Sequence, residues 1–438
     1  MKKLFIIFGI VALASCKPNL KVDTPTANGL DFSNYVAVGN SVTAGYADGS
    51  LYRSGQINSY PNMLASHFGL LGQSIVFKQP LLRSDAGFPS PKRVLGYYTD
   101  CTGATSLAPT FTTDPVDSLD NTNISVEGPF NNFGIPGIRA IDYLIPGYAD
   151  LAAAYGFPYA KRMFTNSAWR PLDELKLSSP TFFTLWLGTN DVLGYALSGG
   201  EENTTLAIHP NNISDFNQFR AGYDSVLSVL TRTGAKGVLL NIPDITTIPF
   251  FTTIPANGMV LDTIQASKLN AATGTTMFRA GNNYFIIQDI SAPGGARQMK
   301  DGELVLLSIP QDSLKCYGWG SLVPIPKRYV LTHDEVAKIN GAITSINAHI
   351  AGKAVAMNLP LVDINTFLKN AMTGYMYNGV SYTTQFISGG AFSLDGVHLT
   401  PRGQALVANE IIRAMNSFYK STLPMIDVHQ YPGIRFPL

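Results

Sequence analysis

Four short apolar runs, far apart in the chain, constrain the fold more than any other feature of the sequence. They are Tyr35–Gly39, Thr181–Leu187, Val238–Ile242 and Leu359–Ile364. Runs of this length that end in turn residues are typical of buried β-strands. Segments with helical periodicity lie between them, such as the one from Phe216 to Leu230. This alternation predicts an α/β fold, a three-layer α/β/α arrangement with a central parallel sheet and helices on both faces.

Two of the predicted helices have clear start signals. Thr332 and Glu335 have the spacing of a capping box, and Thr400 followed by Pro401 supplies an N-cap and a first-turn proline. A third helix is expected around Ser59–Phe68. Apolar residues recur at helical spacing in all three, and we expect them to be buried: Met63, Leu64, Phe68, Val336, Ile339, Ile343, Ile346, Ile350, Ala405, Leu406, Ile411, Ile412 and Met415.

Two long stretches, at about 73–128 and 243–329, show no sustained period. Structureless loops of that length are uncommon in a compact domain, so we predict packed insertions within one domain at 31–438. Two interpretations of their aromatic residues stay open. These residues either line a cleft for a sugar or an acyl chain, or form the core of the insertions: Tyr97, Tyr98, Phe111, Phe250, Phe251 and Trp319.

The first residues of the chain have the pattern of a processing signal. Lys2 and Lys3 precede the apolar segment Leu4–Ala14, which is too short to span a bilayer. Its end, Leu13-Ala-Ser-Cys16, resembles a bacterial lipobox, which implies a signal peptide at 1–15, a lipid on Cys16 and a flexible tether at 16–30. An ordinary secretory signal is the alternative. Lys17 in place of Asp favours the outer membrane, on either its periplasmic or its cell-surface face.

Composition excludes some function classes. The 438 residues carry a formal net charge of +1 with no run of one sign, so a nucleic-acid partner is not expected. The six histidines have no ligand spacing, and we predict neither a metal nor a cofactor. An exported compartment permits a disulfide between Cys101 and Cys316, although two buried thiols are an equal alternative.

Polar residues follow the predicted strands or open the helices after them. Ser41 follows the first strand, and by itself it could simply cap a helix. A loop with two glycines around a proline spans Asn131–Gly137, and Asn190 follows Gly188 after the second strand. Asp395 and His398 lie three residues apart, just before the last helix. The carboxyl ends of parallel strands form the functional edge of such a sheet, which is where we expect these groups.

These four motifs occur in the order Gly39-Asn40-Ser41, the Gly134 loop, Gly188-Thr189-Asn190-Asp191 and Asp395-Gly-Val-His398. Together they resemble the SGNH (GDSL-type) hydrolase family. The resemblance implies Ser41 as nucleophile, His398 as base, Asp395 as its partner, and an oxyanion hole made by the Ser41 and Gly134 amides and the Asn190 side chain. Asn40 departs from the family, which has Asp there; we expect the loss of a charge or of an acceptor for the turn.

The predicted function is that of an exported serine esterase or acylhydrolase acting through an acyl-enzyme on Ser41. Its partner would be an ester substrate: an acetylated glycan, a short-chain ester or a lipid. The alternative is a lipid-anchored binding or scaffold lipoprotein that keeps the fold with weak or lost activity. Asp191 is expected to orient its loop. We expect structural roles for the other histidines, including the pair Asp427 and His429 in the tail: His67, His209, His333, His349 and His429.

Overall fold

The computed structural model describes residues 24–203, 205, 208 and 210–437. The predicted signal peptide at 1–15 and the predicted lipid site at Cys16 lie outside these residues. Within the described ranges, no helix is both long enough and apolar enough to cross a membrane.

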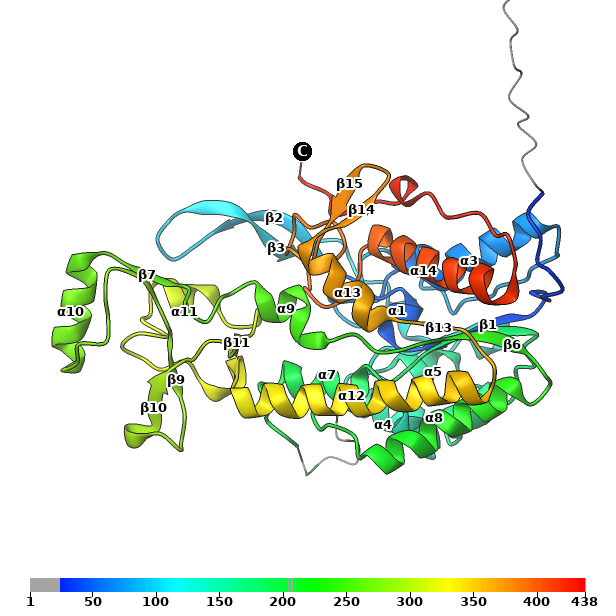
Figure 1. Cartoon of the computed structure of the whole chain (residues 1–438), viewed down its shortest axis with the longest axis horizontal. Helices are drawn as coiled ribbons and strands as arrows, with labels where there is room; N and C mark the ends of the chain where they lie inside the picture. Colours follow the sequence, from blue (N-terminus) through cyan, green and yellow to red (C-terminus); the bar gives the residue numbers. More distant parts are fainter. Residues whose placement is uncertain (1–23, 204, 206–207, 209, 438) are drawn as a thin grey trace, which may run out of the picture.

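A sheet of five parallel strands forms the centre of the molecule, in the order β13-β6-β5-β1-β4 (Figure 1). Every residue of β1 and β5 is buried. Helices cover both faces, which explains why these strands are continuous apolar runs rather than alternating ones. The α/β prediction is therefore confirmed. The strands are β1 (Tyr35–Gly39), β4 (Asn132–Gly134), β5 (Phe182–Trp186), β6 (Lys236–Leu240) and β13 (Leu361–Val362).

Strand β4 was not expected from the sequence. Its three residues pair with Ala37, Val38 and Gly39 of β1 at the edge of the sheet. Side-chain amides hold this edge: Asn131 Nδ2 donates to the Tyr35 carbonyl and Asn132 Nδ2 donates to the Thr43 carbonyl. Side-chain hydrogen bonds, rather than strand propensity, thus place the loop that follows β4.

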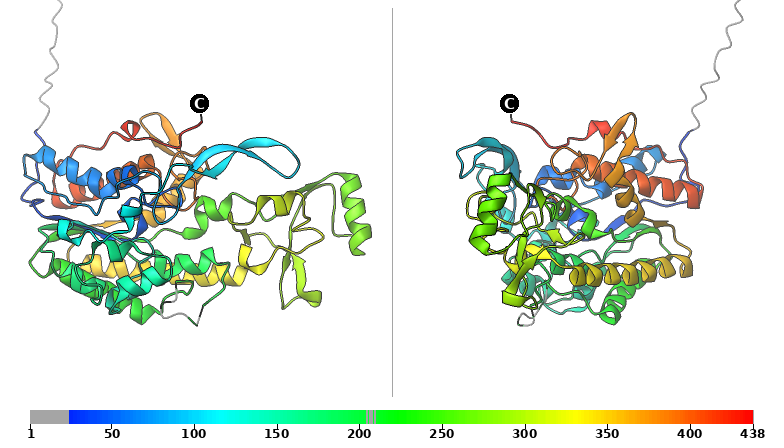
Figure 2. Two further views of the ribbon diagram at one scale, coloured as in Figure 1. Left: turned by 180° about the vertical axis from the view of Figure 1, so that it is seen from behind. Right: turned by 60° about the vertical axis from the view of Figure 1, so that its left-hand side comes forward.

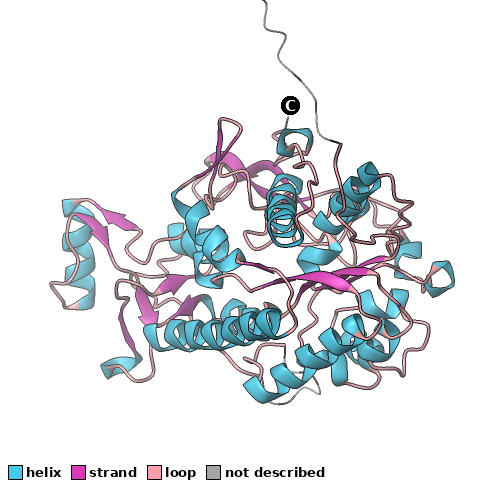
Figure 3. Cartoon of the chain, turned by 45° about the vertical axis from the view of Figure 1, so that its right-hand side comes forward, coloured by secondary structure: helices cyan, strands magenta, loops and turns pink. Residues whose placement is uncertain are grey.

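Helices lie in two layers, one on each side of the sheet (Figure 3). The first layer contains α3 (Tyr60–Phe68), α13 (Ile364–Thr373) and α14 (Pro401–Tyr419); the second contains α4 (Tyr148–Ala154), α5 (Tyr159–Met163), α7 (Asn190–Leu197), α8 (Phe216–Thr231) and α12 (His333–Ala356). The helix start signals predicted from the sequence are present in the structure. Thr332 and Glu335 form a capping box at α12, and the Thr400 hydroxyl accepts from the Gly403 amide at the start of α14.

The two stretches expected as insertions add no strand to the central sheet within the described residues. The first forms a long hairpin, and the second forms small sheets with their own apolar core, which includes Phe285, Ile287 and Val305. Figure 2 shows both on the same side of the molecule. Their elements are β2 (Arg93–Thr99), β3 (Thr105–Phe111), α9 (Pro249–Thr252), β7 (Met259–Leu261), α10 (Thr263–Thr273), β8 (Gly281–Asn283), β9 (Ile286–Gln288), β10 (Ala296–Gln298), β11 (Leu304–Val305) and α11 (Gln311–Lys315).

The remaining short α-helices and strands are α1 (Ser41–Ala44), α2 (Arg53–Ile57), α6 (Pro171–Leu175), β12 (Val330–Leu331), β14 (Tyr375–Tyr377) and β15 (Val380–Tyr382). Among them, β12 pairs with β11 and β14 pairs with β15.

A disulfide joins the two insertions, which settles the alternative left open by the sequence. Cys101 at the tip of the β2–β3 hairpin pairs with Cys316 after α11, with the Cα atoms 6.4 Å apart. Lys315 Nζ lies 2.9 Å from an Asp100 carboxylate oxygen, and the Tyr98 hydroxyl donates to Asp312 over 2.6 Å. The covalent bond and its polar neighbours therefore tie two otherwise separate segments together.

Replacing both Cys101 and Cys316 with Ser should loosen the insertions and spare the sheet, because the bond crosses between the insertions only. Hydrogen exchange should rise in β2, β3 and α11, with β5 unchanged. The parent protein treated with a reductant is the control, because it lacks the bond but keeps both cysteine side chains. It should show the same hydrogen exchange as the double variant. An equal rise of exchange in β5 would contradict this account.

Candidate active site

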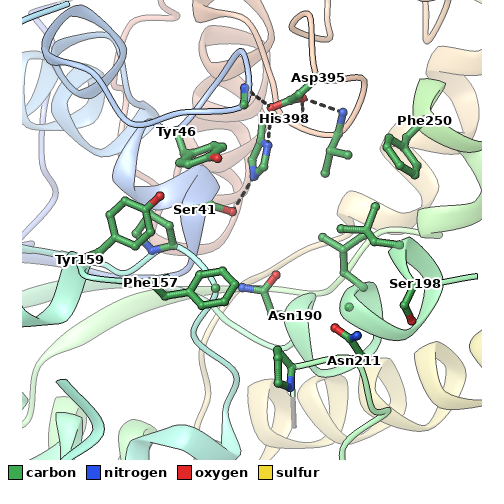
Figure 4. Close-up of a pocket in the computed structure, with 18 of the residues that line it drawn as sticks. Ser41, Tyr46, Phe157, Tyr159, Asn190, Ser198, Asn211, Phe250, Asp395 and His398 are labelled. Atoms are coloured by element: carbon green, nitrogen blue, oxygen red, sulfur yellow. Dashed lines mark hydrogen bonds and ion pairs between the residues drawn. The ribbon is translucent and has the colours of Figure 1, made fainter. Parts of the chain in front are cut away.

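A hydrogen-bonded chain of three side chains lies at the carboxyl edge of the sheet (Figure 4). Ser41 is the first residue of α1, directly after β1, and its Oγ is 2.7 Å from His398 Nε2. The other ring nitrogen of His398, Nδ1, is 2.8 Å from Asp395 Oδ2. Ser41 comes from one end of the domain, and Asp395 and His398 come from the loop before α14. The structure thus brings these three predicted residues together.

The Asp395 side chain is only 8% exposed, and its carboxylate accepts from several donors besides the imidazole. These donors are the amides of Gly49 at 2.9 Å, Val397 at 2.8 Å and His398 at 2.8 Å, and the Ser393 hydroxyl at 3.1 Å. Burial opposes ionisation, but His398 and the backbone amides outweigh it and hold the pKa of Asp395 below its usual range. The carboxylate can therefore fix which imidazole nitrogen carries the proton.

The segment around Asp48 brings the Gly49 amide to Asp395. Asp48 Oδ1 accepts from the Leu394 amide at 2.9 Å, and its Oδ2 accepts from the Tyr52 hydroxyl at 2.7 Å. Burial raises the pKa of Asp48. The sequence analysis did not predict this contact between the segment after Ser41 and the loop of Asp395; the turn-forming dipeptide Asp48-Gly49 was the available signal.

Asn40, the departure from the family pattern, caps α1. Its Oδ1 accepts from the Val42 amide at 3.2 Å. The expected loss of an acceptor for the turn does not occur, because an asparagine oxygen accepts this bond as an aspartate oxygen would. The substitution removes a charge and keeps the local geometry of Ser41.

Asn190 lies at the start of α7 and shares a cavity with Ser41. Its Nδ2 donates to the Ile138 carbonyl at 3.0 Å, which fixes the side chain and leaves a second N–H. The Ser41 amide is the first of α1 and donates to no acceptor among the residues that the structure describes. Two donors of the predicted oxyanion hole are therefore available beside the serine.

The prediction that the Gly134 amide is the third donor is wrong. This amide is 2.8 Å from Asn132 Oδ1 and so is already used. Gly134 is small for a packing reason, since a Cβ there would lie 2.2 Å from the Ala44 nitrogen. Gly137, the second glycine of the same loop, lines the cavity instead. Its φ of 84° favours glycine, and its amide has no acceptor in the described part of the chain.

Asp191 holds the backbone that follows the Asn131–Gly137 loop. Its carboxyl is fully buried and accepts from the Ala140 amide at 2.8 Å, which agrees with the expected orienting role. Burial raises the pKa of Asp191 to about 7, against the effect of the Ala140 bond and of nearby Arg139.

The other histidines that the structure describes lie away from the site. His349 Nε2 is 2.8 Å from Asp224 between α12 and α8, and His333 bonds to the Asp301 carbonyl. His67 lies on α3, and His429 is 3.9 Å from Asp427. His209 lies outside the described residues. Across those residues, no three His, Cys, Asp or Glu side chains gather to hold a metal ion.

Two cavities meet at Ser41 and His398. The larger, of about 640 Å³, is an open cleft whose walls include Tyr46, Phe157, Tyr159 and Phe250. Tyr46 also packs its ring 4.6 Å from the imidazole of His398. The smaller, of about 40 Å³, has mostly apolar walls: Trp186, Leu193, Pro243, Ile245, Ile248, Leu368 and Phe392.

Only one of the insertion aromatics singled out in the sequence, Phe250, lines the larger cleft. Phe251 is buried in the main core, and Trp319 packs against the core of the second insertion. Tyr97, Tyr98 and Phe111 are exposed on the hairpin. Phe250 therefore fits the cleft interpretation and Trp319 the insertion-core interpretation, and the other four residues fit neither.

Comparison with known families agrees with this geometry. The family model described as GDSL-like Lipase/Acylhydrolase matches residues 35–411. The chain belongs to this family. The match contains Ser41, Asn190, Asp395 and His398, and membership implies hydrolase activity of the acylhydrolase or esterase kind. A search of curated proteins found no match.

We predict that Asp191 makes stability depend on pH. Between its ordinary pKa of 3.8 and its folded value of about 7, the unfolded chain releases a proton that the folded chain keeps. Rising pH in this window therefore favours unfolding, by up to about 4 kcal/mol at ~1.36 kcal/mol per pKa unit. Urea unfolding of the parent and of Asp191→Asn from pH 4 to 8 tests this. The free energy of unfolding of the parent should fall relative to that of Asp191→Asn as the pH rises toward 7. A difference between the two proteins that does not change with pH would contradict this prediction.

Proposed function

We propose that the protein is an exported serine esterase that cleaves carboxylic esters through an acyl-enzyme on Ser41. The observation that carries the proposal is the continuous chain from Ser41 Oγ to His398 and Asp395, with contacts of 2.7 and 2.8 Å. A free serine hydroxyl is a weak nucleophile, and an adjacent base that is itself oriented by a carboxylate makes it reactive.

The acylation step follows from this arrangement. His398 Nε2 takes the proton from Ser41 Oγ as the oxygen attacks the ester carbonyl carbon. The imidazolium then donates that proton to the leaving alcohol, and the acyl group stays on Ser41. Asp395, held ionised by its five donors, stabilises the imidazolium between the two transfers. Water attacks the acyl-enzyme in the second half of the reaction, with His398 again as base.

The oxyanion of each tetrahedral intermediate is received by three donors in our proposal. They are the amides of Ser41 and Gly137 and the second Nδ2 hydrogen of Asn190. All three residues line the cleft. Donors held by the fold before the reaction stabilise the developing charge without reorganisation.

The acyl group is short in our proposal. The small cavity beside Ser41, of about 40 Å³, has mostly apolar walls and is far smaller than the open cleft of about 640 Å³, so it suits a short acyl chain. The open cleft of about 640 Å³ then takes the alcohol part of the ester. Short-chain esters and acetylated glycans therefore fit better than long-chain lipids.

Export and anchoring complete the proposal. The charged, apolar and Cys16-terminated start of the chain supports a lipoprotein signal, with the protein attached to the outer membrane through lipid on Cys16. The Cys101–Cys316 disulfide is consistent with an oxidising compartment outside the cytoplasm.

Ser41→Ala and His398→Ala should each abolish turnover of p-nitrophenyl acetate, because each removes a partner of the proton transfer. His349→Ala is the matched control, since His349 also binds an aspartate at 2.8 Å but lies away from Ser41. Asn190→Ala should lower kcat by about 100- to 1000-fold with little change in KM, because its bond forms in the transition state. Steady-state kinetics measure all four. Turnover that survives in Ser41→Ala would overturn the assignment, and a folded but inactive parent would favour a binding lipoprotein.

A short acyl pocket predicts a sharp chain-length limit. The kcat/KM should fall by about tenfold or more between p-nitrophenyl butyrate and octanoate, because the added methylenes find no apolar space or strain the wall. Ile248→Ala should extend the accepted length, as it enlarges the small cavity. Leu197→Ala, in the wall of the open cleft, should leave the preference unchanged. Octanoate turnover equal to that of butyrate would rule the pocket out.

A further inference from the structure

A single arginine faces the open cleft beside the catalytic groups. Arg93 begins β2 in the first insertion and lines the cavity that contains Ser41 and His398. Its side chain makes no hydrogen bond or ion pair with any residue that the structure describes, and its guanidinium lies 5.6 Å from the ring of Phe111. A partly buried cation whose contact is with an aromatic ring has lost part of its hydration without gaining a hydrogen-bond acceptor or a counter-ion among the described residues.

The backbone of the catalytic loop forms the support for this guanidinium. A Cβ at Gly49 would lie 2.0 Å from Arg93 Nη1, so only the absence of a side chain there lets the guanidinium lie against the loop. The amide of the same Gly49 donates to Asp395. The Arg93 backbone is also fixed, since its amide donates to the Asp48 carbonyl at 2.8 Å. The charge is thus held next to the triad by residues of the site itself.

Neither of the two neighbouring carboxylates forms an ion pair with Arg93. Asp395 is saturated by its own donors, and Asp48 bonds to Leu394 and Tyr52. Among the described residues that line the cleft, only Asp395 is acidic, and its side chain is 8% exposed. The side chain of the preceding residue, Lys92, lies 4.2 Å over the ring of Tyr52 and does not line this cleft.

We propose that Arg93 binds an anionic group on the alcohol part of the ester substrate. This inference rests on the proposed function and narrows its substrate class. A guanidinium binds a carboxylate or a phosphate through two parallel hydrogen bonds, and an unpaired positive charge in a low-dielectric cleft attracts anions. The acyl part occupies the small apolar cavity, which offers no cation. The substrates are therefore short-chain acyl esters of acidic alcohols, such as acylated sugar acids or sugar phosphates.

The test compares anionic and neutral esters that share one acyl group. The probes are 4-acetoxybenzoate, 3-acetoxybenzoate and 4-acetoxycinnamate, which carry the carboxylate at different distances from the ester, each beside its carboxamide; 4-acetoxyphenyl phosphate is the phosphate arm. The parent should prefer at least one anionic probe over its neutral match by about tenfold or more, mainly in KM, because a hydrogen bond to a charged group contributes about that much. The preference should weaken as salt is added.

Arg93→Gln should remove this preference and leave the neutral esters within about twofold of the parent, and Arg93→Lys should keep part of it. Lys92→Gln is the matched control, since it removes the same charge one residue away and should keep the preference. Equal losses on anionic and neutral esters in Arg93→Gln, or no preference in the parent, would overturn the proposal.

Calorimetry separates this proposal from the proposed function. Binding of the best anionic probe to Ser41→Ala, which cannot turn it over, should weaken by about tenfold in the Ser41→Ala, Arg93→Gln double variant. Binding that depends on Arg93, without turnover by the parent, would overturn the proposed esterase function and support the anion site. Turnover of neutral esters, without binding that depends on Arg93, would overturn the anion site and support the esterase function.

Discussion

The buried carboxylate of Asp395 is the group on which the rest of the site depends. Without its donors it would be a charge taken out of water, which is among the most unfavourable events in folding. The Gly49 amide, the Ser393 hydroxyl and two amides of its own loop satisfy it together with His398. Satisfying this carboxylate and joining the two distant parts of the domain are therefore one event.

The parallel sheet makes such a site possible, and its motifs could be predicted because they mark ends of elements. Ser41 follows a buried strand, Asn190 opens a helix after another, and Asp395 and His398 precede a capped helix. Buried apolar runs and capping residues are local signals, so a single sequence reveals them. The motifs do not reveal the distances between them, because those distances depend on the order of the strands in the sheet.

The parts that could not be predicted depend on contacts between distant residues. Strand β4 lacks a propensity signal and is held by side-chain amides of Asn131 and Asn132. Whether Gly134 or Gly137 keeps a free amide depends on where Asn132 Oδ1 lies, which no spacing rule reveals. Arg93 reaches the cleft only because an aperiodic insertion folds back over the loop at Gly49.

The origin of the triad from opposite ends of the domain has a consequence for when the protein becomes active. Ser41 and His398 are separated by 357 residues, yet their side chains touch. A chain still emerging from the ribosome carries Ser41 before His398 has been made. In the proposed mechanism, hydrolysis therefore starts only after α14 has docked, and esters met before that point are left intact.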